Sequence, residues 1–260
     1  CSRGNALPYG LLFATRPFNL HELYMLRRDP YTDAGRAEVS NWIFALRGFS
    51  VINKLPFWSM CGNILNVTVD CPTETPHIAV TSWKTEADSW NAAVKKTPDP
   101  DPTRYQRLAT LLNGVLRSPV RPDYVILPEL SLPARWFLRF ALKLQGRGIS
   151  LISGIEYLHR TRKRVSNQVW AALTHDGLGF PLMVVYQQDK QRAALHEEQD
   201  LRELGGLVLT PRRKWKVPPV VHHGRVHFAM LICSELTNIA YRSSLRGKVD
   251  ALFIPEWNKD

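Results

Sequence analysis

The sequence predicts an α/β protein: a two-sheet sandwich flanked by helices and preceded by a smaller, mainly helical region. Three observations carry this prediction. Short apolar runs typical of buried strands alternate with amphipathic segments from residue 77 onward. The apolar runs 165–173 and 182–186 are separated by a glycine-rich turn at residues 176–179, which indicates a β-hairpin. Residues 1–76 instead contain segments with helical spacing of their apolar side chains.

Residues 1–76 are expected to form an accessory region or the end of a preceding domain. Apolar spacing predicts one helix from Phe18 to Arg28 and a second from Ala37 to Phe49. Ile64 to Val69 alternates as a strand does. The proline-bounded stretch Cys71–Pro76 has the composition of a linker, so we expect the domain boundary after residue 76.

Residues 77–260 are expected to form one α/β domain. Leu108, Leu111 and Leu112 share one face of an amphipathic helix, and Pro133 is a suitable first residue for the next helix. A further helix should follow Cys233 and end near Gly247. The expected strands are 78–83, 124–127, 149–152, 165–173, 182–186, 226–232 and 251–254, and the other expected helices are 104–117 and 133–145.

The composition excludes several classes of protein. With 260 residues, 45% hydrophobic and 22% charged, the chain can bury a sizeable core. It has no apolar run near the ~20 residues that span a bilayer, so no membrane partner is expected. No phosphate-binding loop or GxGxxG motif is present, and no cofactor is expected. The four cysteines form no CxxC pair, which favours a reducing cytoplasm over a disulfide framework.

Positive charge is concentrated in the second region. The formal net charge is +11; residues 1–76 hold 7 basic and 6 acidic side chains, whereas residues 77–260 hold 27 and 17. Two clusters contribute, Arg160–Arg164 and Arg212–Lys216, the second with Trp215 inside it. Such clusters are commonly solvated hairpin and loop charges. They can also bind a nucleic acid or an acidic protein, because cations attract phosphates and an aromatic ring can stack on a base.

Cys233 is the first candidate for a catalytic residue. It ends the apolar run Phe228–Ile232 and begins a helix-like stretch. A helix N-terminus carries partial positive charge and unpaired N–H groups, and both lower the pKa of a thiol. The alternative is a small, inert, buried side chain, which is the usual role of a single cysteine beside an apolar strand.

Glu129 and Lys190 also lie directly beyond apolar strands. Glu129 follows Pro128, which should stop strand pairing, and ligand sites of open α/β sheets lie at such strand ends. Lys190 follows the apolar run 182–186 and precedes Glu197 and Glu198. Taken alone, each segment favours a solvated loop or surface residue over a functional one.

The ordered series Glu129, Lys190, Cys233 resembles the Glu-Lys-Cys triad of the nitrilase superfamily of carbon–nitrogen hydrolases. The resemblance covers roughly residues 77–260. Its further anchors are Leu127-Pro128, Ile149–Gly154, Asp176-Gly177, Glu198, Ile232 and Val249–Pro255.

The resemblance implies a fold, a reaction and a set of roles. The fold would be an α-β-β-α sandwich, here incomplete at its C-terminal end. Cys233 would attack an amide or nitrile carbon and form a thioester, with Glu129 as general acid and base and Lys190 as stabiliser of the tetrahedral state. Glu198 matches a second glutamate that positions substrate and water, with Glu197 as the alternative. Trp257 would lie near the substrate or serve as a core aromatic.

The sequence departs from the family at the nucleophile. Many members have Cys-Tyr-Asp or Cys-Trp-Asp there, whereas this chain has Cys233-Ser234-Glu235. The lost aromatic residue and the longer acid would reshape the pocket.

His222, His223 and His227 are the remaining candidates for metal ligands. His223 and His227 share a face whether the segment is a helix or a strand, but no cysteine or aspartate of ligand spacing lies nearby. We therefore expect no metal site.

Two functions are in competition. The first is a thiol-dependent hydrolase acting on a small amide or nitrile, working as a homo-oligomer. The second is a catalytically silent module for assembly and nucleic-acid association. The stretches 232–238 and 255–260 resemble nitrilase domains that follow a reverse transcriptase in bacterial antiviral defence proteins, although no Tyr-x-Asp-Asp polymerase motif is present.

Overall fold

The structure, a computed structural model, describes residues 25–26, 32–46, 58–69, 74–175 and 182–257. The chain divides into two compact units, 1–56 and 57–260. Helix α3 (Asp33–Leu46) belongs to the first unit and overlaps the helix expected from Ala37. Its side chains Val39 and Trp42 are buried, as the apolar face of an amphipathic helix requires. Most of the helix expected over 18–28 and part of the expected linker lie outside the described residues.

The larger sheet of the second unit contains β3 (Ile78–Val80), β4 (Tyr124–Leu132), β5 (Ser150–Thr161), β6 (Arg164–His175), β7 (Leu182–Asp189) and β8 (Val208–Leu209). Over the described residues its order is β3-β4-β5-β6-β7, and β8 pairs with β6. The pairs from β3 to β5 are parallel, whereas β5, β6 and β7 are antiparallel neighbours. The β6–β7 pair confirms the expected hairpin strands; their connecting turn lies outside the described residues.

The smaller sheet contains β1 (Trp58–Cys61), β2 (Ile64–Val67), β9 (Val220–His223), β10 (Val226–Met230) and β11 (Ala251–Phe253). Its described strands follow the order β1-β2-β9-β10-β11. Strand β2 runs parallel to β9, with Leu65 opposite Val221. The boundary expected after residue 76 was therefore wrong, because residues 58–67 are part of this sheet and the second unit begins at Phe57.

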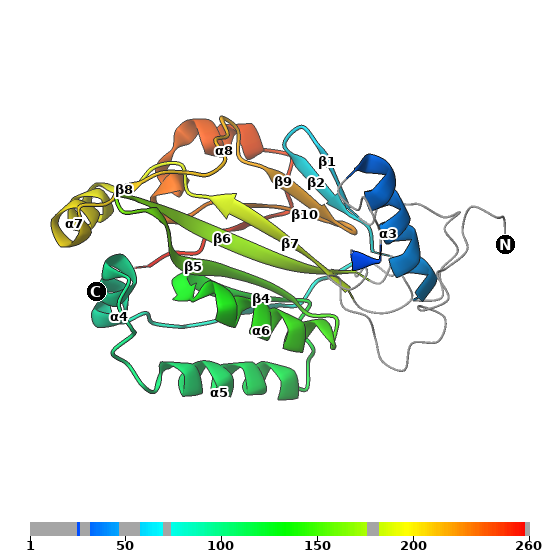
Figure 1. Cartoon of the computed structure of the whole chain (residues 1–260), viewed down its shortest axis with the longest axis horizontal. Coiled ribbons are helices and arrows are strands. Elements are labelled where there is room, and N and C mark those ends of the chain that lie inside the picture. Colours follow the sequence, from blue (N-terminus) through cyan, green and yellow to red (C-terminus); the bar gives the residue numbers. More distant parts are fainter. Residues whose placement is uncertain (1–24, 27–31, 47–57, 70–73, 176–181, 258–260) are drawn as a thin grey trace. The chain divides into compact units, whose positions relative to one another are not determined.

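Helices lie outside the two sheets and complete the expected helix–sheet–sheet–helix layers (Figure 1). Helices α5 (Arg104–Arg117) and α6 (Ala134–Gln145) lie beside the larger sheet, and α8 (Ile239–Leu245) lies beside the smaller one. The further helices are α4 (Ala87–Lys95) and α7 (Leu195–Gly205), together with the short 3-10 turn η1 (Cys233–Thr237).

The prediction of a single helix after Cys233 was wrong. The chain forms η1, breaks at Asn238, and then begins α8. The Asn238 side chain accepts hydrogen bonds from the backbone N–H groups of Ala240 and Tyr241, at 3.0 and 3.4 Å, and so caps the second helix.

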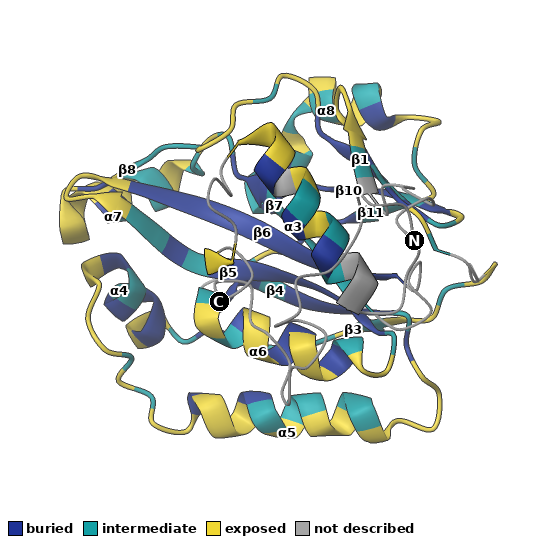
Figure 2. Ribbon diagram, turned by 45° about the vertical axis from the view of Figure 1, so that its right-hand side comes forward, coloured by how far each residue is buried: buried dark blue, intermediate teal, exposed yellow. Residues whose placement is uncertain are grey.

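Two apolar clusters explain the layering. Between the sheets, Val67, Ile152, Val169 and Phe228 pack with other strand residues. A second cluster joins the larger sheet to α5 and α6, with Phe137 fully buried in it. Strand β6 contributes to both clusters and is buried along almost its whole length (Figure 2). Both faces of the larger sheet are therefore covered, as a mostly apolar sheet requires.

Buried hydrogen bonds also join the two sheets, and His223 forms two of them. His223 Nε2 lies 2.6 Å from the carbonyl oxygen of Thr174, and its Nδ1 lies 2.5 Å from the Tyr124 hydroxyl. A carbonyl can only accept, so Nε2 carries the proton and the hydroxyl donates to Nδ1. His222 and His227 face each other on β9 and β10, with ring centroids 4.3 Å apart. The three histidines therefore do not converge.

No helix in the described ranges has both the length and the apolar character needed to cross a bilayer.

Candidate active site

Glu129, Lys190 and Cys233 lie around one cavity of about 460 Å³. Glu129 comes from β4, Lys190 follows the last residue of β7, and Cys233 begins η1 just beyond β10. The cavity lies at the junction of the two sheets, because β4 and β7 belong to the larger sheet and β10 to the smaller one. Three side chains far apart in the sequence therefore converge, as the sequence analysis expected. Other wall residues are Leu130, Tyr157, Ala194, His196, Glu197, Asp200 and Trp257.

Lys190 lies between two carboxylates. Its Nζ is 2.8 Å from Glu129 Oε1 and 2.7 Å from Glu197 Oε2. The ammonium group is buried, which disfavours its charge, but the two carboxylates outweigh burial and raise the pKa of Lys190. Lys190 therefore stays protonated and can donate to a third acceptor inside the cavity.

Glu129 is a buried carboxylate with two donors. Asn167 Nδ2 donates to Glu129 Oε1 at 2.6 Å, on the same oxygen that Lys190 approaches. Burial raises the pKa of Glu129, Lys190 opposes this rise, and the nearby charge of Glu197 adds to it. Lys190 and Asn167 thus stabilise the ionised form, while the raised pKa makes this carboxylate a stronger base than an exposed one.

Glu197, rather than Glu198, is the second glutamate of the site. Its Oε1 accepts from Tyr157 Oη at 2.8 Å and from Asn167 Nδ2 at 2.9 Å. Glu198 instead lies on the exposed side of α7 and pairs with Arg202 one helical turn later. The assignment of Glu198 to the substrate site was therefore wrong, and the alternative residue takes its place.

Asn167 and Tyr157 were missed by the sequence analysis. The signal for Asn167 was present: Ser166, Asn167 and Gln168 are consecutive polar residues inside an otherwise apolar run, and all three are buried. A buried polar side chain needs a partner, so such a triplet marks a hydrogen-bonded site. Tyr157 carried no comparable signal.

Cys233 adopts a left-handed backbone conformation with φ of +49°. Its N–H donates to the carbonyl of Pro255 at 3.1 Å, which fixes the turn against the segment after β11. A non-glycine residue in this conformation costs about 1 kcal/mol or more and is retained where the surroundings enforce it. The turn directs the cysteine to the cavity at the end of β10.

The pKa of the Cys233 thiol is raised, contrary to expectation. Burial is the main cause and the charge of Glu129 adds to it, while Lys190 and the backbone N–H groups of Trp257 and Ser234 oppose it. The expected helix dipole is weak because η1 has five residues. Cys233 is therefore a neutral thiol at rest, and it needs a neighbouring base to become a nucleophile.

The backbone that carries Glu129 leaves the sheet as a bulge. Strand β4 pairs with β5 up to Leu127 and resumes at Leu132, so Pro128 interrupts the ladder without ending the strand. Gly154 on β5 lies directly behind: a Cβ atom there would be 2.3 Å from Glu129 Cα. Leu130, beside Glu129, has a positive φ of +57°.

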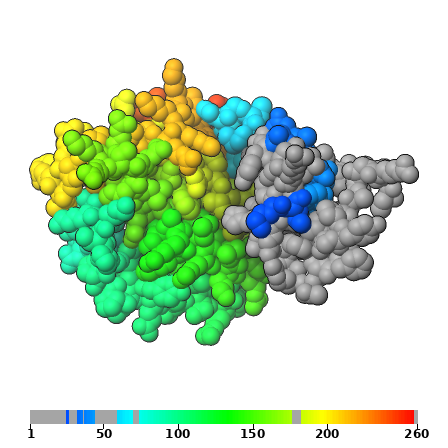
Figure 3. All heavy atoms as spheres, viewed as in Figure 1, coloured from blue at the N-terminus to red at the C-terminus, as the bar shows by residue number. Residues whose placement is uncertain are grey.

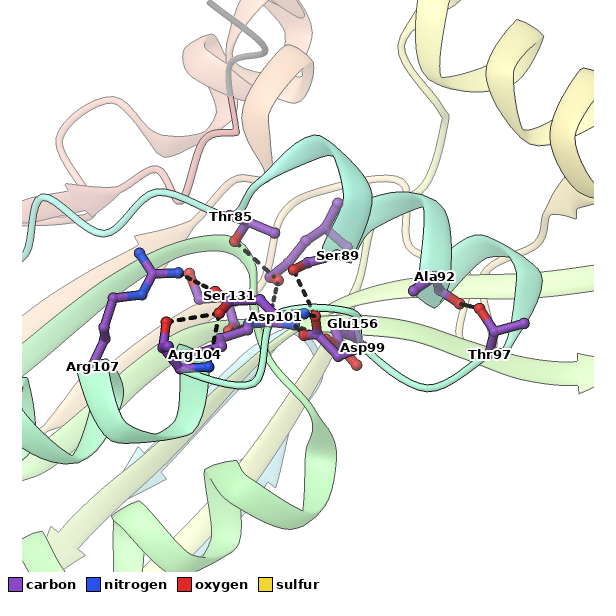
Figure 4. Close-up of polar contacts among 12 residues, drawn as sticks. Thr85, Ser89, Ala92, Thr97, Asp99, Asp101, Arg104, Arg107, Ser131 and Glu156 are labelled. Carbon is purple, nitrogen blue, oxygen red and sulfur yellow. Dashed lines mark hydrogen bonds and ion pairs between the residues drawn. The ribbon is translucent and has the colours of Figure 1, made fainter.

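Side chains hold the carbonyl groups of this bulge (Figure 4). Arg104 Nη2 donates to Ser131 O at 2.8 Å and to Leu130 O at 3.4 Å. The buried guanidinium of Arg104 also pairs with Asp99 and Glu156. Buried backbone carbonyls outside a sheet ladder need such donors, so this cluster positions the loop of the catalytic candidate Glu129.

Glu235 ties the lysine segment to the cysteine turn. Its buried carboxylate accepts from the backbone N–H of Gln191 at 2.7 Å and from that of Ile232 at 3.0 Å. Burial raises the pKa of Glu235 to about 7, and the two backbone donors oppose the rise. The longer acid at this position thus fixes the neighbours of Lys190 and Cys233.

Trp257 forms one wall of the cavity. Its ring stacks on Trp90, with centroids 5.3 Å apart and planes 11° from parallel, and its Nε1 donates to Thr85 O at 2.9 Å. Both contacts hold the ring in place, so one aromatic face of the cavity is fixed before any ligand binds.

The described residues contain no group of three or more histidine, cysteine, aspartate or glutamate side chains arranged to hold a metal ion. The polar groups around Lys190 bind one another, and the arrangement is suited to proton transfer and anion stabilisation.

Comparison with known proteins finds similarity at the level of structure. No protein-family model matches the sequence, and no curated protein is significantly similar to it. Similar solved structures include an amidase from Nesterenkonia sp. (14% identity, TM-score 0.41) and a CN-hydrolase superfamily protein from Xanthomonas campestris (14%, 0.45). The alignments cover 70% of this chain and 65% and 64% of those chains, so it spans less than two thirds of their length.

A glutamine-dependent NAD+ synthetase from Acinetobacter baumannii is also similar, with 15% identity, a TM-score of 0.42 and coverage of 69% of this chain and 32% of that one. At these scores the comparisons carry no inference about activity, which is argued below from the geometry of the cavity.

Proposed function

We propose that this chain is a thiol-dependent hydrolase of non-peptide carbon–nitrogen bonds, with Cys233 as nucleophile, Glu129 as general base and acid, and Lys190 as the stabiliser of negative charge. The observation that carries the proposal is the single cavity lined by all three, in which Lys190 Nζ lies 2.8 Å from Glu129 Oε1. A buried base, cation and thiol together are the groups that acyl transfer requires.

The reaction proceeds in two halves. Glu129 accepts the thiol proton as Cys233 Sγ adds to the amide carbon, and the same proton passes to the leaving nitrogen as the C–N bond breaks. Ammonia or an amine leaves and a thioester remains. Glu129 then takes a proton from water, the hydroxide adds to the thioester carbon, and the carboxylic acid and the free thiol are released. A nitrile would enter by the same attack.

Lys190 stabilises the negative charge that develops during the reaction. In the tetrahedral states the former carbonyl oxygen carries negative charge, and a preorganised ammonium group stabilises it without reorganisation. Glu129 and Glu197 keep Lys190 charged, as its raised pKa indicates. Glu197 thus holds the cation in place, while Tyr157 and Asn167 hold Glu197.

The cavity is suited to a small acyl group. Its volume of about 460 Å³ has Leu130, Tyr157 and the fixed Trp257 ring as apolar walls. We propose short aliphatic amides as first test substrates. Butyramide is a practical choice, since it is the ligand in one structure of the Nesterenkonia sp. amidase.

The test follows both halves of the reaction. Incubation with butyramide should release ammonia, and mass spectrometry should find a butyryl adduct on Cys233 that disappears in Cys233→Ser. Glu129→Gln should lower the rate by about 10²–10⁴-fold. Glu198→Gln is the control, because it removes a carboxylate from the exposed side of α7, outside the cavity, and should leave the rate unchanged.

The alternative, a catalytically silent module for assembly, predicts a different reactivity of the Cys233 thiol. Alkylation by iodoacetamide should then modify Cys233 no faster in the unchanged chain than in Glu129→Gln. A clear slowing in Glu129→Gln, together with slower alkylation of the exposed Cys61, supports the enzyme. Homo-oligomerisation, a cytoplasmic location and the association with an antiviral reverse transcriptase stay predictions from the sequence.

A further inference from the structure

A second hollow of about 420 Å³ shares no lining residue with the active-site cavity. Three segments form it: the C-terminal end of α4, the end of β5 with the turn that follows it, and the C-terminal end of α7 with the residues just after it. The corresponding segments adjoin at the left of the molecule in Figure 3, in teal, light green and yellow. We call this hollow the hairpin groove.

The hairpin groove is strongly cationic. Lys95 and Lys96 line it from α4, Arg160 and Arg162 line it from the hairpin, and none of its lining residues is acidic. Lys163 and Arg164 extend the positive charge beyond the rim. All six side chains are exposed, and none of them forms an ion pair within the part of the chain that the structure describes.

The walls of the groove are fastened to one another. The His159 ring donates from Nε2 to the carbonyl of Ala93 at 2.8 Å, which ties the hairpin to α4. On the other side, Val208 N donates to Lys163 O at 2.9 Å, where β8 pairs with β6 after α7. The charges therefore sit on a preformed scaffold, and a ligand has little backbone to order on binding.

Two helix ends reduce the positive potential without cancelling it. Helices α4 and α7 both end at the groove, and each C-terminus carries about half a negative charge. Four lining cations exceed this by a wide margin. The surplus requires an anionic partner or remains solvated.

We propose that the hairpin groove binds the phosphodiester backbone of a nucleic acid strand. Lys95 and Lys96, at the end of α4, line one side of the groove, and Arg160 and Arg162 line the hairpin side, so a chain of phosphates can run between two cationic walls. Arginine binds phosphate oxygens through paired N–H donors. The described lining contains no Phe, Tyr or Trp ring for base stacking, so recognition is by charge and independent of base sequence.

An acidic protein fits the groove less well. Protein interfaces depend on buried apolar and aromatic anchors. Here Val94 and Leu207 are buried in the core, and among the apolar side chains of the lining Leu204 alone is exposed. The groove thus offers charge with little apolar contact surface, which suits a polyphosphate chain.

The other basic cluster, Arg212–Lys216, provides a matched control. Its backbone is held by the carboxylate of Asp189, which accepts from Arg213 N at 3.0 Å. Asp189 also lines the hollow to which Arg212 and Arg213 belong. This cluster has the same kind of charge but includes a carboxylate and lacks two facing cationic walls.

The test measures binding of a fluorescent single-stranded oligonucleotide to the full chain by anisotropy across a salt series. The double variant Arg160→Gln with Arg162→Gln should weaken binding at least tenfold and reduce the slope of log affinity against log salt by about 1.4, or ~0.7 for each lost phosphate contact. The control, Arg212→Gln with Lys214→Gln, removes the same charge and should change affinity less than about twofold if these residues make no phosphate contact.

Four results would overturn the proposal: no salt-dependent binding, equal loss of affinity in both double variants, equal competition by polyglutamate, or equally strong competition by inorganic phosphate. Equal loss would show attraction by net charge alone, and equal competition would show an acidic-protein surface. Competition by inorganic phosphate at concentrations as low as those of the oligonucleotide would likewise show a small-anion site. Unchanged alkylation of Cys233 in both variants checks that the fold is intact.

Discussion

At the scale of single residues, three neighbours set the acid–base behaviour of Glu129. Lys190 and Asn167 stabilise its ionised form, whereas burial and the charge of Glu197 oppose ionisation. The proposed mechanism requires the ionised form for the first proton transfer. The rate should therefore fall as the pH decreases through the raised pKa of Glu129, which gives the pH–rate profile an acidic limb.

We predict that this acidic limb moves in opposite directions in two variants. Glu197→Gln removes a charge that raises the pKa of Glu129, so the limb should move to lower pH. Asn167→Ala removes a hydrogen bond that lowers this pKa, so the limb should move to higher pH. The measurement is kcat/KM for amide hydrolysis from about pH 4 to 8, the range in which a carboxyl base titrates.

Glu198→Gln is the control for this prediction and should leave the limb in place. If both site variants move the limb in the same direction, Glu129 does not control it, and the proposed base is wrong.

The convergence of Glu129, Lys190 and Cys233 on one cavity could be predicted, because each lies at or just beyond a recognisable buried strand. The choice between Glu197 and Glu198 could not. Consecutive residues of a helix project about 100° apart, and the phase of α7 depends on where the helix begins. Its start at Leu195 directs Glu197 to Lys190 and Glu198 to Arg202.

At the scale of secondary-structure elements, the bulge of β4 determines where Glu129 lies. The bulge lies against β5 at Gly154, where the backbone of Glu129 and Leu130 comes close to the backbone of Gly154. Contacts of this kind cannot be relieved by a change of rotamer. The glycine is therefore required by the shape of the neighbouring strand, and its own backbone has no positive φ.

We predict that Gly154→Ala destabilises the chain strongly. The added Cβ would lie 2.3 Å from Glu129 Cα and 2.5 Å from Leu130 N, so the bulge must move. The expected loss is about 3 kcal/mol or more in the free energy of unfolding, at the upper end of overpacking effects. Urea unfolding followed by circular dichroism measures it.

The matched control is Gly114→Ala, in helix α5, where a Cβ would meet no atom within 4 Å. Alanine is the better helix former by about 1 kcal/mol, so this variant should be more stable than the unchanged chain. A similar loss in the free energy of unfolding in both variants would contradict the proposal that the β4 bulge requires glycine at position 154.

The elements of the larger sheet could be predicted more fully than those of the smaller one. Helix α5 has the expected bounds, because its apolar spacing and the following loop are local signals. Strand β2 was expected, but its partner β9 lies far along the chain, and no local pattern identifies such a pairing. The break at Asn238 was also missed, although asparagine is a common helix cap.

At the scale of the whole second unit, the two sheets are joined mainly by apolar packing, into which His223 introduces a polar link. Its two ring nitrogens are both used by groups of the larger sheet, Tyr124 and Thr174. Burial lowers the pKa of His223, and the nearby His175 lowers it further. The hydrogen bond to Thr174 and the charge of Asp123 act in the opposite direction, but the pKa is lowered overall. The folded chain therefore keeps this histidine neutral where an unfolded chain would protonate it.

We predict that this link stabilises the sandwich near neutral pH and that its contribution falls on acidification. The pKa of the folded state is lowered from 6.5, so below that pH the unfolded chain binds the extra proton and unfolding is favoured. Relative to His223→Gln, which cannot titrate, the unchanged chain should lose up to about 1.4 kcal/mol per pH unit below 6.5. At about pH 7.5 it should be the more stable by about 1–3 kcal/mol, because glutamine cannot replace both bonds. Urea unfolding of both chains at several pH values measures the difference, and a constant gap would show that His223 has the same pKa in the folded and unfolded states.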